Sequence, residues 1–574
     1  MQTAQVARVL EQMGTLMEVR GENPFRCRAY HNAAQALRGL PDDLAEMIAQ
    51  GRLKDVPGIG EAIHQKIVTL VTTGSLPAFD ALKSDTPPGL VALLRVPGLG
   101  PKKIKQLHDE LKITSLADLR LAAESGKIAG LKGFGTKAEA KIKEGIAFLE
   151  KAGDRILQST ARRLAEPLLA AVRSSPGVIR AEVCGSLRRR AETSGDLDIV
   201  FASDSPADVL AAFAKRPEVE EVLGLGETKA SVRVAGGVQC DVRGVAEVQY
   251  PFALHYFTGS KAHNIAMRRR AIAHGYKLSE YGLEGPDGWI PCEDEAALFE
   301  ALGLSYIPPE LREGMDEIEL AAVGPLPKLV ETADLQGTFH CHTDWSDGAN
   351  TLEQMAEAAR SIGLKYLGIA DHSRAAAYAG GLSIERVHQQ WAAIDALNAS
   401  YGGSFRLFKG TECDILADGT LDFPDDVLAG FDYVVASVHS GFQMGVEEMT
   451  ARIVRAVRHP LVTMLGHASG RLLLARDSYA VDLDAVIDAA AGSGTLIEIN
   501  ASPYRLDLDW EHCRKAKAQG VGLVINPDAH STGGLADLDY GVGVARRAGL
   551  GARDVFNTRS PDAVASALRG KARR

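Results

Sequence analysis

The C-terminal part of the chain, residues 336–574, constrains the fold most strongly, because its short apolar segments end in side chains that can bind a metal. Residues 433–438 lead to His439, for example, and residues 461–466 lead to His467. Helical patterns separate these segments. Alternation of this kind predicts parallel strands joined by crossover helices and closed into a barrel, with the functional side chains at the carboxyl ends of the strands.

Nine histidine and carboxylate side chains follow the apolar segments in this way. One zinc ion needs only four ligands, so nine candidates imply a cluster of two or three ions such as Zn²⁺ or Mn²⁺. A single buried histidine is usually a core or capping residue, but six that terminate apolar segments argue against that explanation. The candidate ligands are His340, His342, Asp347, His372, Glu412, His439, His467, Asp528 and His530.

A second feature lies in residues 184–200, where Asp196 and Asp198 stand two apart in an apolar run. On a strand these side chains point to the same face, and two adjacent carboxylates repel unless a cation holds them. A divalent ion with oxygen ligands is the simplest such cation. The Gly185-Ser186 turn and the three arginines that follow it suit phosphate, so the pattern indicates phosphoryl or nucleotidyl transfer. The alternative is an exposed strand with two solvated aspartates.

A third carboxylate is predicted to lie beside this pair. Residues 230–234 and 238–242 alternate as two paired strands around a Gly-Gly turn, and Asp241 lies on the second of them. The set resembles the nucleotidyltransferase palm of family X DNA polymerases, which are similar to DNA polymerase beta. The residues that carry this resemblance are Gly185, Ser186, Asp196, Asp198 and Asp241.

The resemblance implies that the three aspartates are catalytic and hold two Mg²⁺ or Mn²⁺ ions. One ion would activate the primer 3′-hydroxyl and the other would escort the incoming triphosphate. Gly185, Ser186 and Arg189 match positions that hold this triphosphate, whereas Arg190 stands where the family usually has glycine.

Residues 256–260, Tyr-Phe-Thr-Gly-Ser, also match family X, where this turn packs against the nucleotide sugar. The resemblance implies that Tyr256 and Phe257, with Gly259, bind the nucleotide and crowd a ribose 2′-hydroxyl. It also implies that Asn264 and Arg268 face the minor groove of the nascent base pair. The alternative is a buried aromatic turn before a basic helix.

The N-terminal region repeats one two-glycine pattern at residues 56–60, 96–100 and 131–135, each time before a helix-compatible run. Two glycines allow a tight turn with positive φ, and the helix N-terminus that follows offers free N–H groups to an anion. Three copies within 80 residues favour a functional repeat over a plain helix–helix turn. The pattern resembles the helix-hairpin-helix motif, which grips DNA backbone phosphates. The glycines expected to bind DNA are Gly58, Gly60, Gly98, Gly100, Gly133 and Gly135.

Residues 25–34, FRCRAYHNAA, are similar to the small amino-terminal domain of DNA polymerase beta. In that family a lysine forms a Schiff base with the sugar of an abasic 5′ end. Lys66 stands at this position, but Ala62 stands where the family often has a phosphate-binding lysine. A lyase role for Lys66 and a plain DNA-facing or solvated lysine both remain open.

The nine candidate ligands, in the order HxH, D, H, E, H, H and DxH, closely resemble the PHP (polymerase and histidinol phosphatase) domain. The resemblance implies a distorted seven-stranded barrel that hydrolyses phosphoesters by metal-activated water. Residues 410–416, 436–442 and 527–531 also match the variant fused to bacterial family X polymerases. The similarity therefore spans nearly the whole chain.

At 574 residues the chain is too long for one core. The expected fold is multidomain: α-helical helix-hairpin-helix domains, an α/β nucleotidyltransferase palm with a small C-terminal subdomain, and a distorted (β/α)₇ PHP barrel. Residues 145–180 have a helical pattern that leads into the palm. We expect the following segments: 1–85, a helical DNA-end-binding domain; 86–150, a second helical domain; 151–250, the palm; 251–320, the nascent-base-pair subdomain; 321–335, a linker; and 336–574, the barrel.

We expect a DNA polymerase that fills gaps during DNA repair, with a metal-dependent 3′-5′ exonuclease in its PHP domain. Its partners would be gapped or primer-template DNA and dNTPs, with no membrane. We expect a monomer in the cytoplasm, since seven scattered cysteines suit a reducing compartment. The net charge of −10 decides little, because local basic patches govern DNA binding.

Two other functions remain open. The first 330 residues could be a gap-binding module with weak synthesis, attached to a PHP exonuclease or 3′-end-processing phosphatase. Alternatively, the PHP domain could act on a small phosphorylated metabolite.

Overall fold

The computed structural model describes residues 3–38, 44–56, 58–94, 96 and 99–571. They form two compact units, one made of Met1–Gly153 with Leu474–Arg476 and the other of Asp154–Leu473 with Asp477–Arg574. The division into six segments stays a prediction. Among the described residues, no helix is long and apolar enough to cross a membrane. The seven cysteines are buried and unpaired.

The described part of the first unit is helical, as predicted, and its side chains pack into two apolar cores. Leu10, Leu37 and Ile67 lie in one core, and Leu107 and Ile142 in the other. Burial of each such side chain contributes about 1.5–3 kcal/mol to stability. The helices are α1 (Thr3–Arg20), α2 (Pro24–Arg38), α3 (Leu44–Ala49), α4 (Glu61–Thr73), α5 (Pro77–Ser84), α6 (Pro88–Leu93), α7 (Pro101–Leu111), α8 (Leu116–Glu124) and α9 (Gly135–Ala152).

The second unit begins with a correction to the helical pattern predicted for residues 145–180. α9 ends at Gly153, which has a positive φ of 59°, and a short strand, β1 (Ile156–Leu157), follows. β1 pairs with β3 (Thr193–Ser194). The helix α10 (Gln158–Arg173) ends before β2 (Val178–Val183). The predicted helical pattern was therefore right for α9 and α10, and wrong for their connection and for residues 178–180, which begin β2.

A five-stranded mixed sheet forms the centre of the palm. The predicted hairpin around the Gly-Gly turn is confirmed, because its two strands are antiparallel neighbours. The strand that carries the aspartate pair is parallel to the second strand of this hairpin. The order across the sheet is β2 (Val178–Val183), β4 (Leu197–Ser203), β7 (Val238–Val245), β6 (Lys229–Val234) and β5 (Val219–Leu225).

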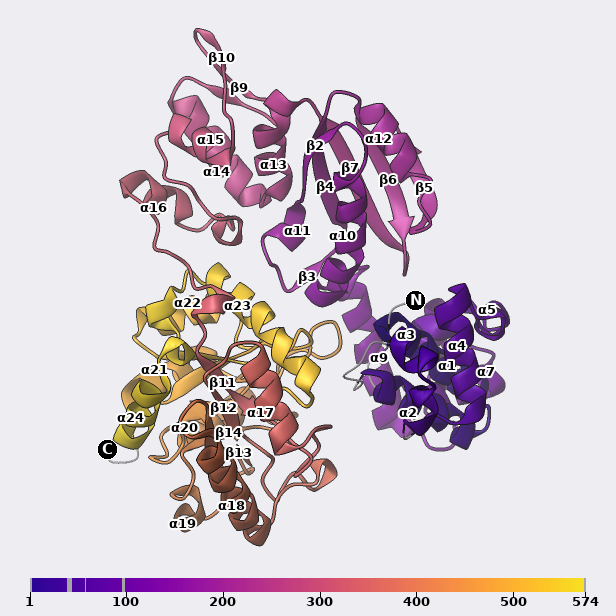
Figure 1. The fold of residues 1–574 in the computed structure, drawn as a ribbon, viewed down its shortest axis with the longest axis vertical. Coiled ribbons are helices and arrows are strands. Elements are labelled where there is room, and N and C mark those ends of the chain that lie inside the picture. The colour runs from indigo at the N-terminus through magenta and orange to yellow at the C-terminus, as the bar shows by residue number, and fades with distance from the viewer. Residues whose placement is uncertain (1–2, 39–43, 57, 95, 97–98, 572–574) are drawn as a thin grey trace. The chain divides into compact units, whose positions relative to one another are not determined.

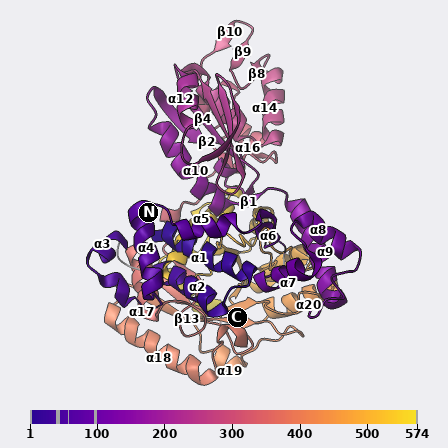
Figure 2. The same cartoon turned by 90° about the vertical axis from the view of Figure 1, so that its right-hand side faces the viewer.

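Helices cover both faces of this sheet (Figure 2). α10 and α12 (Pro206–Phe213) lie on one face, where their apolar side chains share a core with β4 and β7. α13 (Tyr250–Thr258) packs on the other face. The sheet is therefore rigid where β4 and β7 present their carboxylates.

A small subdomain follows the palm and has its own apolar core. Its helices and its three-stranded antiparallel sheet appear beside the palm in Figure 1. They are α14 (Lys261–Ala273), β8 (Lys277–Leu278), β9 (Leu283–Gly285), β10 (Gly288–Ile290), α15 (Glu295–Ala301) and α16 (Glu317–Val323).

The C-terminal segment contains seven parallel strands in sequence order, as the alternating pattern predicts. Several strands, such as YLGI and YVVAS, are buried throughout, which explains their continuous apolar character. They are β11 (Gly337–Cys341), β12 (Tyr366–Ile369), β13 (Arg406–Asp414), β14 (Tyr433–Ser437), β15 (Met464–Leu465), β16 (Leu496–Asn500) and β17 (Leu523–Asn526).

The seven strands form a nearly closed barrel. The first and last strands meet through a bridge between Cys341 and Ala529, and Phe339 N donates to the side chain of Asn526 at 3.2 Å. The helices around it are α17 (Leu352–Ser361), α18 (Ile384–Tyr401), α19 (Asp425–Leu428), α20 (Val446–Val457), α21 (Leu483–Ser493), α22 (Trp510–Ala518), α23 (Leu538–Arg547) and α24 (Pro561–Lys571).

Candidate functional site

The barrel places its nine candidate ligands at the carboxyl ends of its strands. His340 lies in β11 and Glu412 in β13, and most of the others lie in the loop just after a strand. Three of them have positive φ angles: 54° for His340, 25° for His467 and 54° for Asp528. Residues with a Cβ rarely adopt this conformation, and such strain concentrates at functional sites.

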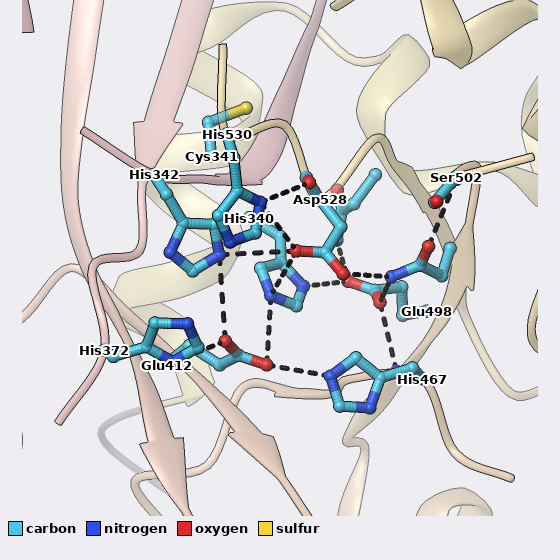
Figure 3. Close-up of polar contacts among 12 residues, drawn as sticks. His340, Cys341, His342, His372, Glu412, His467, Glu498, Ser502, Asp528 and His530 are labelled. Carbon is cyan, nitrogen blue, oxygen red and sulfur yellow. Dashed lines mark hydrogen bonds and ion pairs between the residues drawn. The ribbon is translucent and has the colours of Figure 1, made fainter. Parts of the chain in front are cut away.

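All nine side chains come together in four overlapping groups, within which the ligand atoms lie within 4.8 Å of one another. In Figure 3, His340, His342, His372 and His467 lie around Glu412, and Asp528 and His530 lie on the far side of His340 and His342. The groups are His342, Asp347, His372 and His530; His340, His342 and Glu412; His340, His467 and Asp528; and His372, Glu412 and His439.

Glu412 occupies the centre of this cluster. Its Oε1 lies 2.9 Å from His467 Nε2 and 3.1 Å from His340 Nε2. Its Oε2 lies 3.0 Å from His372 Nδ1. One carboxylate that faces histidines with both of its oxygens can bridge two ions.

Several buried nitrogens of the cluster fit metal ions. Among the described residues, both ring nitrogens of His342 and Nδ1 of His467 are buried and make no hydrogen bond. Nε2 of His340 and Nδ1 of His372 face the Glu412 carboxylate at 3.1 Å and 3.0 Å. A buried polar atom without a partner is costly, and a coordinated ion would remove that cost. The buried cluster is therefore consistent with a site for several metals.

Charges within the cluster shift its pKa values in opposite directions. Burial lowers the pKa of His439, but Glu412 and Asp414 outweigh burial and raise it to about 10. Burial, followed by the neighbouring His530 and His372, lowers the pKa of His342 to about 3. Burial raises the pKa of Glu412, but the surrounding histidines hold it well below its ordinary value.

A second layer of carboxylates supports the ligands, and the sequence prediction did not include it. Glu498 Oε2 lies 2.6 Å from His340 Nδ1, and Asp414 Oδ1 lies 2.5 Å from His439 Nδ1. Metal-binding histidines commonly donate their second nitrogen to such a carboxylate. Glu498 also ends an apolar run, in β16, which was the available sequence signal.

In the palm, the strand register brings two of the three predicted carboxylates together. Asp198 on β4 is the direct partner of Asp241 on the parallel strand β7, while Asp196 precedes β4. Gly185 lies against this pair with a φ of 60°, and a Cβ there would be 2.5 Å from Asp198 Oδ2. Only glycine fits both the backbone and the space.

The pKa values of Asp198 and Asp241 shift in opposite directions. Burial, followed by repulsion from Asp196 and Asp241, raises the pKa of Asp198 to about 7. Burial also raises the pKa of Asp241, but hydrogen bonds from Lys229, Ser231 and Gln239 bring it below its ordinary value. Lys229 Nζ lies 2.7 Å from Asp241 Oδ2. Within the described part of the chain, the three carboxylates do not form a group as tight as those in the barrel.

The predicted phosphate-binding residues border this pair. The Gly-Ser turn is a short helix, α11 (Gly185–Arg188), and Ser186 Oγ donates to Ser194 Oγ at 3.0 Å. Arg189 donates from Nη1 to the carbonyl of Thr258 at 2.6 Å. This bond links α11 to the Gly259 turn, where a Cβ would approach Arg189 Nη1 to 3.2 Å.

The predicted nucleotide-sugar turn is partly helical, because its aromatic pair lies in the last turn of α13. The rings of Tyr256 and Phe257 are perpendicular, with centroids 5.1 Å apart. Asn264 Nδ2 donates to Tyr256 O at 2.8 Å, and the Arg268 guanidinium lies 5.2 Å from the Tyr256 ring centroid. Phe257, Asn264 and Arg268 thus all contact Tyr256.

Each of the three glycine turns of the first unit contains an equivalent backbone hydrogen bond. Ile59 N donates to Val56 O at 3.1 Å, and the same bond recurs at 3.0 Å and 3.1 Å in the second and third copies. Helices α4, α7 and α9 begin at or after the turns. Gly58 and Gly133 have φ angles of 90° and 87°, and Gly135 has 68°.

Open space lies over most of these glycines. A Cβ at Gly60, Gly100, Gly133 or Gly135 would meet nothing within 4 Å, which leaves room for a ligand to approach the backbone. Gly98 lies outside the described residues.

Lys66 lies on α4 of the first unit. Its Nζ donates to Ala62 O at 3.2 Å and lies 5.9 Å from the Tyr30 ring centroid. The lyase role of Lys66 stays a prediction.

Four parts of the chain match known families. Residues 1–76 match a helix-hairpin-helix domain, and residues 90–147 match a SAM-like helix-hairpin-helix tandem. Residues 253–313 match the DNA polymerase beta thumb, and residues 338–502 match the PHP domain. The predicted multidomain fold is confirmed.

Relatives match over different lengths. The chain is 40% identical over 561 residues to the DNA polymerase/3'-5' exonuclease PolX of Bacillus subtilis (strain 168), which covers 97% of each chain. It is 29% identical over 232 residues to a probable phosphatase of Thermoanaerobacter sp. (strain X514), covering 38% of this chain and 89% of the relative. A probable phosphatase of Caldicellulosiruptor saccharolyticus is 30% identical over 215 residues, covering 36% and 84%.

Proposed function

The chain belongs to the PolX family of family X DNA polymerases with a C-terminal PHP domain, and from this we propose that it both extends and shortens DNA 3′ ends. It is a DNA polymerase and a 3′-5′ exonuclease. The observation that carries this proposal is the 40% identity to the Bacillus subtilis enzyme over 97% of both chains. Its finer parts, namely gap filling in DNA repair and the residues responsible, rest on the geometry of the sites.

Synthesis belongs to the palm in this proposal. Asp196, Asp198 and Asp241 hold two Mg²⁺ or Mn²⁺ ions, which supply charge neutralisation and an activated 3′-hydroxyl when bound. The register that pairs Asp198 with Asp241 supports this role, as does the glycine that Asp198 requires at its side. The carboxylates orient the ions, and the protein keeps them on two adjacent rigid strands.

The incoming dNTP binds beside the carboxylates. Gly185, Ser186 and Arg189 hold the triphosphate, because the N-terminus of α11 and a guanidinium both favour anions. The aromatic pair Tyr256 and Phe257, with Gly259, receives the sugar. Asn264 and Arg268 face the nascent base pair, and both contact Tyr256.

Shortening of 3′ ends belongs to the barrel. Its nine gathered ligands hold two or three Zn²⁺ or Mn²⁺ ions, which supply a water of lowered pKa when bound. Glu412 would be a ligand at the centre of this site, and Glu498 and Asp414 orient His340 and His439. The half-exposed His530 and Asp347 mark the side from which a DNA end enters.

The helix-hairpin-helix turns hold gapped or primer-template DNA through backbone N–H groups. The shared turn geometry and the open space over the glycines support this role. Gly58, Gly60, Gly98, Gly100, Gly133 and Gly135 are the proposed contacts. Lys66 is retained as a candidate lyase residue, and the protein is proposed to act as a cytoplasmic monomer.

A gapped, 5′-phosphorylated DNA with a labelled primer, dNTPs and Mn²⁺ tests the two activities in one reaction. Extension should disappear in Asp196→Asn/Asp198→Asn and survive in His340→Ala/His342→Ala, while shortening should show the opposite pattern. Extension that persists in the double aspartate variant would refute the palm assignment. Shortening without extension in the unaltered chain would instead favour a gap-binding module attached to a PHP exonuclease.

A further inference from the structure

Two pairs of consecutive arginines face each other across the junction of palm and barrel within the second unit. One pair, Arg189 and Arg190, belongs to the palm, and the other, Arg546 and Arg547, belongs to α23 of the barrel. Both pairs contact the acidic segment that follows α15, at Pro308 to Glu319.

Two glutamates of this segment, Glu310 and Glu313, each bridge one arginine from each side. Glu313 Oε1 accepts from Arg189 Nε at 3.2 Å and from Arg547 Nη2 at 3.0 Å. Glu310 Oε1 accepts from Arg546 Nε at 2.7 Å and lies 3.7 Å from Arg190 Nε. The side chains of Glu310 and Arg547 are only 8% and 6% exposed, so water screens these pairs weakly.

Arg547 also reaches the loop between the palm arginines and the aspartate pair. Its Nη1 donates to Glu192 Oε2 at 3.3 Å, while Glu192 Oε1 accepts from Arg471 Nη2 at 3.3 Å. Its guanidinium lies 5.0 Å from the Trp510 ring centroid. One barrel side chain therefore contacts a palm residue, Glu192, and the carboxylate that holds Arg189.

Arg190 fits the same junction at a cost in backbone strain. Its φ is 55°, a conformation suited to glycine, and glycine is the residue expected there from the family resemblance. Its guanidinium pairs with Asp539 Oδ1 at 3.4 Å. Its side chain lies over Gly543 of α23, where a Cβ would approach Arg190 Cδ to 3.2 Å. The barrel thus provides a carboxylate, Asp539, that pairs with Arg190, and a glycine, Gly543, that leaves room for its side chain.

The junction connects the two candidate active sites. Arg189 donates to Thr258 O beside the proposed nucleotide site. On the other side, α23 packs against β16 and β17, whose ends carry Glu498 and precede Asp528. Loss of an ion pair on α23 would therefore act on the palm, while the packing of α23 against β16 and β17 would remain.

We propose that helix α23 of the barrel positions Arg189 for the incoming triphosphate, through the bridges at Glu313 and Glu310, so that nucleotide binding by the palm depends on the barrel. This proposal rests on the proposed function of Arg189. Arg547 and Arg190 are positioning residues. Without Arg547, the charge of Glu313 would be balanced by Arg189 alone and would oppose the negatively charged triphosphate.

Arg547→Met in the full chain is the principal test, because methionine keeps an unbranched apolar side chain at this buried position and removes the charge. The KM for dNTP should rise about tenfold, with kcat and the exonuclease rate on single-stranded DNA within about twofold of the unaltered chain. Arg547→Lys, which keeps the charge, should recover part of this loss.

Arg514→Met is the matched control. Arg514 on α22 also links barrel and subdomain, since its Nη2 donates to Asp316 Oδ1 at 2.7 Å, but Asp316 bridges no palm arginine. The KM for dNTP should stay unchanged in this variant. Equal KM values in Arg547→Met and Arg514→Met would overturn the proposal, since simple loosening of the junction would then explain any effect.

Arg190→Gly provides a variant that should fold, because glycine suits the positive φ. It should raise the KM for dNTP in the same direction as Arg547→Met, and the double variant should lose less than the product of the two single effects. If the KM increase in the double variant equals the product of the two single increases, the two arginines act independently and the proposal is contradicted.

Amide hydrogen exchange needs no catalysis, so it can test the positioning role even if the proposed function is wrong. Amide hydrogen exchange of Gly185 to Arg190 should be faster in Arg547→Met than in Arg514→Met. Identical exchange would overturn the positioning role even if synthesis is robust. If the unaltered chain extends no primer, the proposed function fails, while the exchange comparison still decides whether α23 holds this turn.

Discussion

Nδ1 of His340 lies 2.6 Å from Oε2 of Glu498, and both side chains are completely buried. The contact directs Nε2 of the same ring toward Glu412, 3.1 Å away. A carboxylate behind a histidine fixes its orientation and increases its basicity as a metal ligand. Glu498 therefore belongs to the proposed exonuclease centre, although it contacts no proposed ion position directly.

Glu498→Gln should weaken metal binding and lower the exonuclease rate by about 10- to 100-fold. Glutamine keeps the volume of Glu498 but not its charge, so the fold should persist. Primer extension should remain within about twofold, because the palm has its own carboxylates. Glu447→Gln, on the exposed first turn of α20, is the control and should change neither rate. An unchanged exonuclease rate in Glu498→Gln would contradict the supporting role.

Gly185→Ala should reduce extension by about a hundredfold, since displacement of a reacting group by an ångström has that order of effect. A Cβ at this position would be 2.5 Å from Asp198 Oδ2, and the φ of 60° disfavours alanine. Exonuclease activity should be retained. Gly224→Ala is the control, because a Cβ there meets nothing within 4 Å. Equal extension rates for the two variants would show that the close approach to Asp198 is not needed.

The stability of the metal-free protein should depend on pH through Asp198. Burial and the neighbouring aspartates raise the pKa of Asp198 from 3.8 to about 7, so the folded state keeps a proton that the unfolded chain has lost. The destabilising charge is absent below about pH 4 and fully present above about pH 7. The free energy of unfolding, measured relative to Asp198→Asn, should therefore fall as pH rises from 5 to 8.

Denaturant unfolding in EDTA at several pH values measures this difference. Added Mg²⁺ should restore stability above pH 7, where the carboxylate is free to bind it, and should do little at pH 5. A constant difference between the two proteins across this range would contradict the raised pKa.

Chelation should affect the two activities differently. Seven of the nine barrel ligands are buried or nearly so, whereas Asp196 in the palm is exposed, so EDTA pretreatment and a brief return to Mg²⁺ should restore extension before the exonuclease. A bound ion at 100 times its Kd contributes about 2.7 kcal/mol to stability, so saturating Mn²⁺ should raise the Tm of the barrel. Calorimetry of His340→Ala should show a smaller response. An equal Tm shift in both proteins would mean that Mn²⁺ binds elsewhere.

Local patterns in the sequence were sufficient for the main architecture. The apolar runs predicted the strands of the barrel, and the residues that end them came together in the four groups around Glu412. The hairpin that carries Asp241 was also predictable, because alternation and a Gly-Gly turn are short-range signals. The short strand β1 was not, since the helical pattern continued past the glycine that ends α9.

The sequence by itself determined which side chains end each strand, because periodicity and turn residues act over a few positions. Tertiary structure decided which of those side chains meet. His340 and Glu498 are 158 residues apart, and only closure of the barrel brings them into contact. Arg190 shows the same limit at the palm. Its departure from glycine was visible in the sequence, but its partners Asp539 and Glu310 come from distant segments that only folding places beside it.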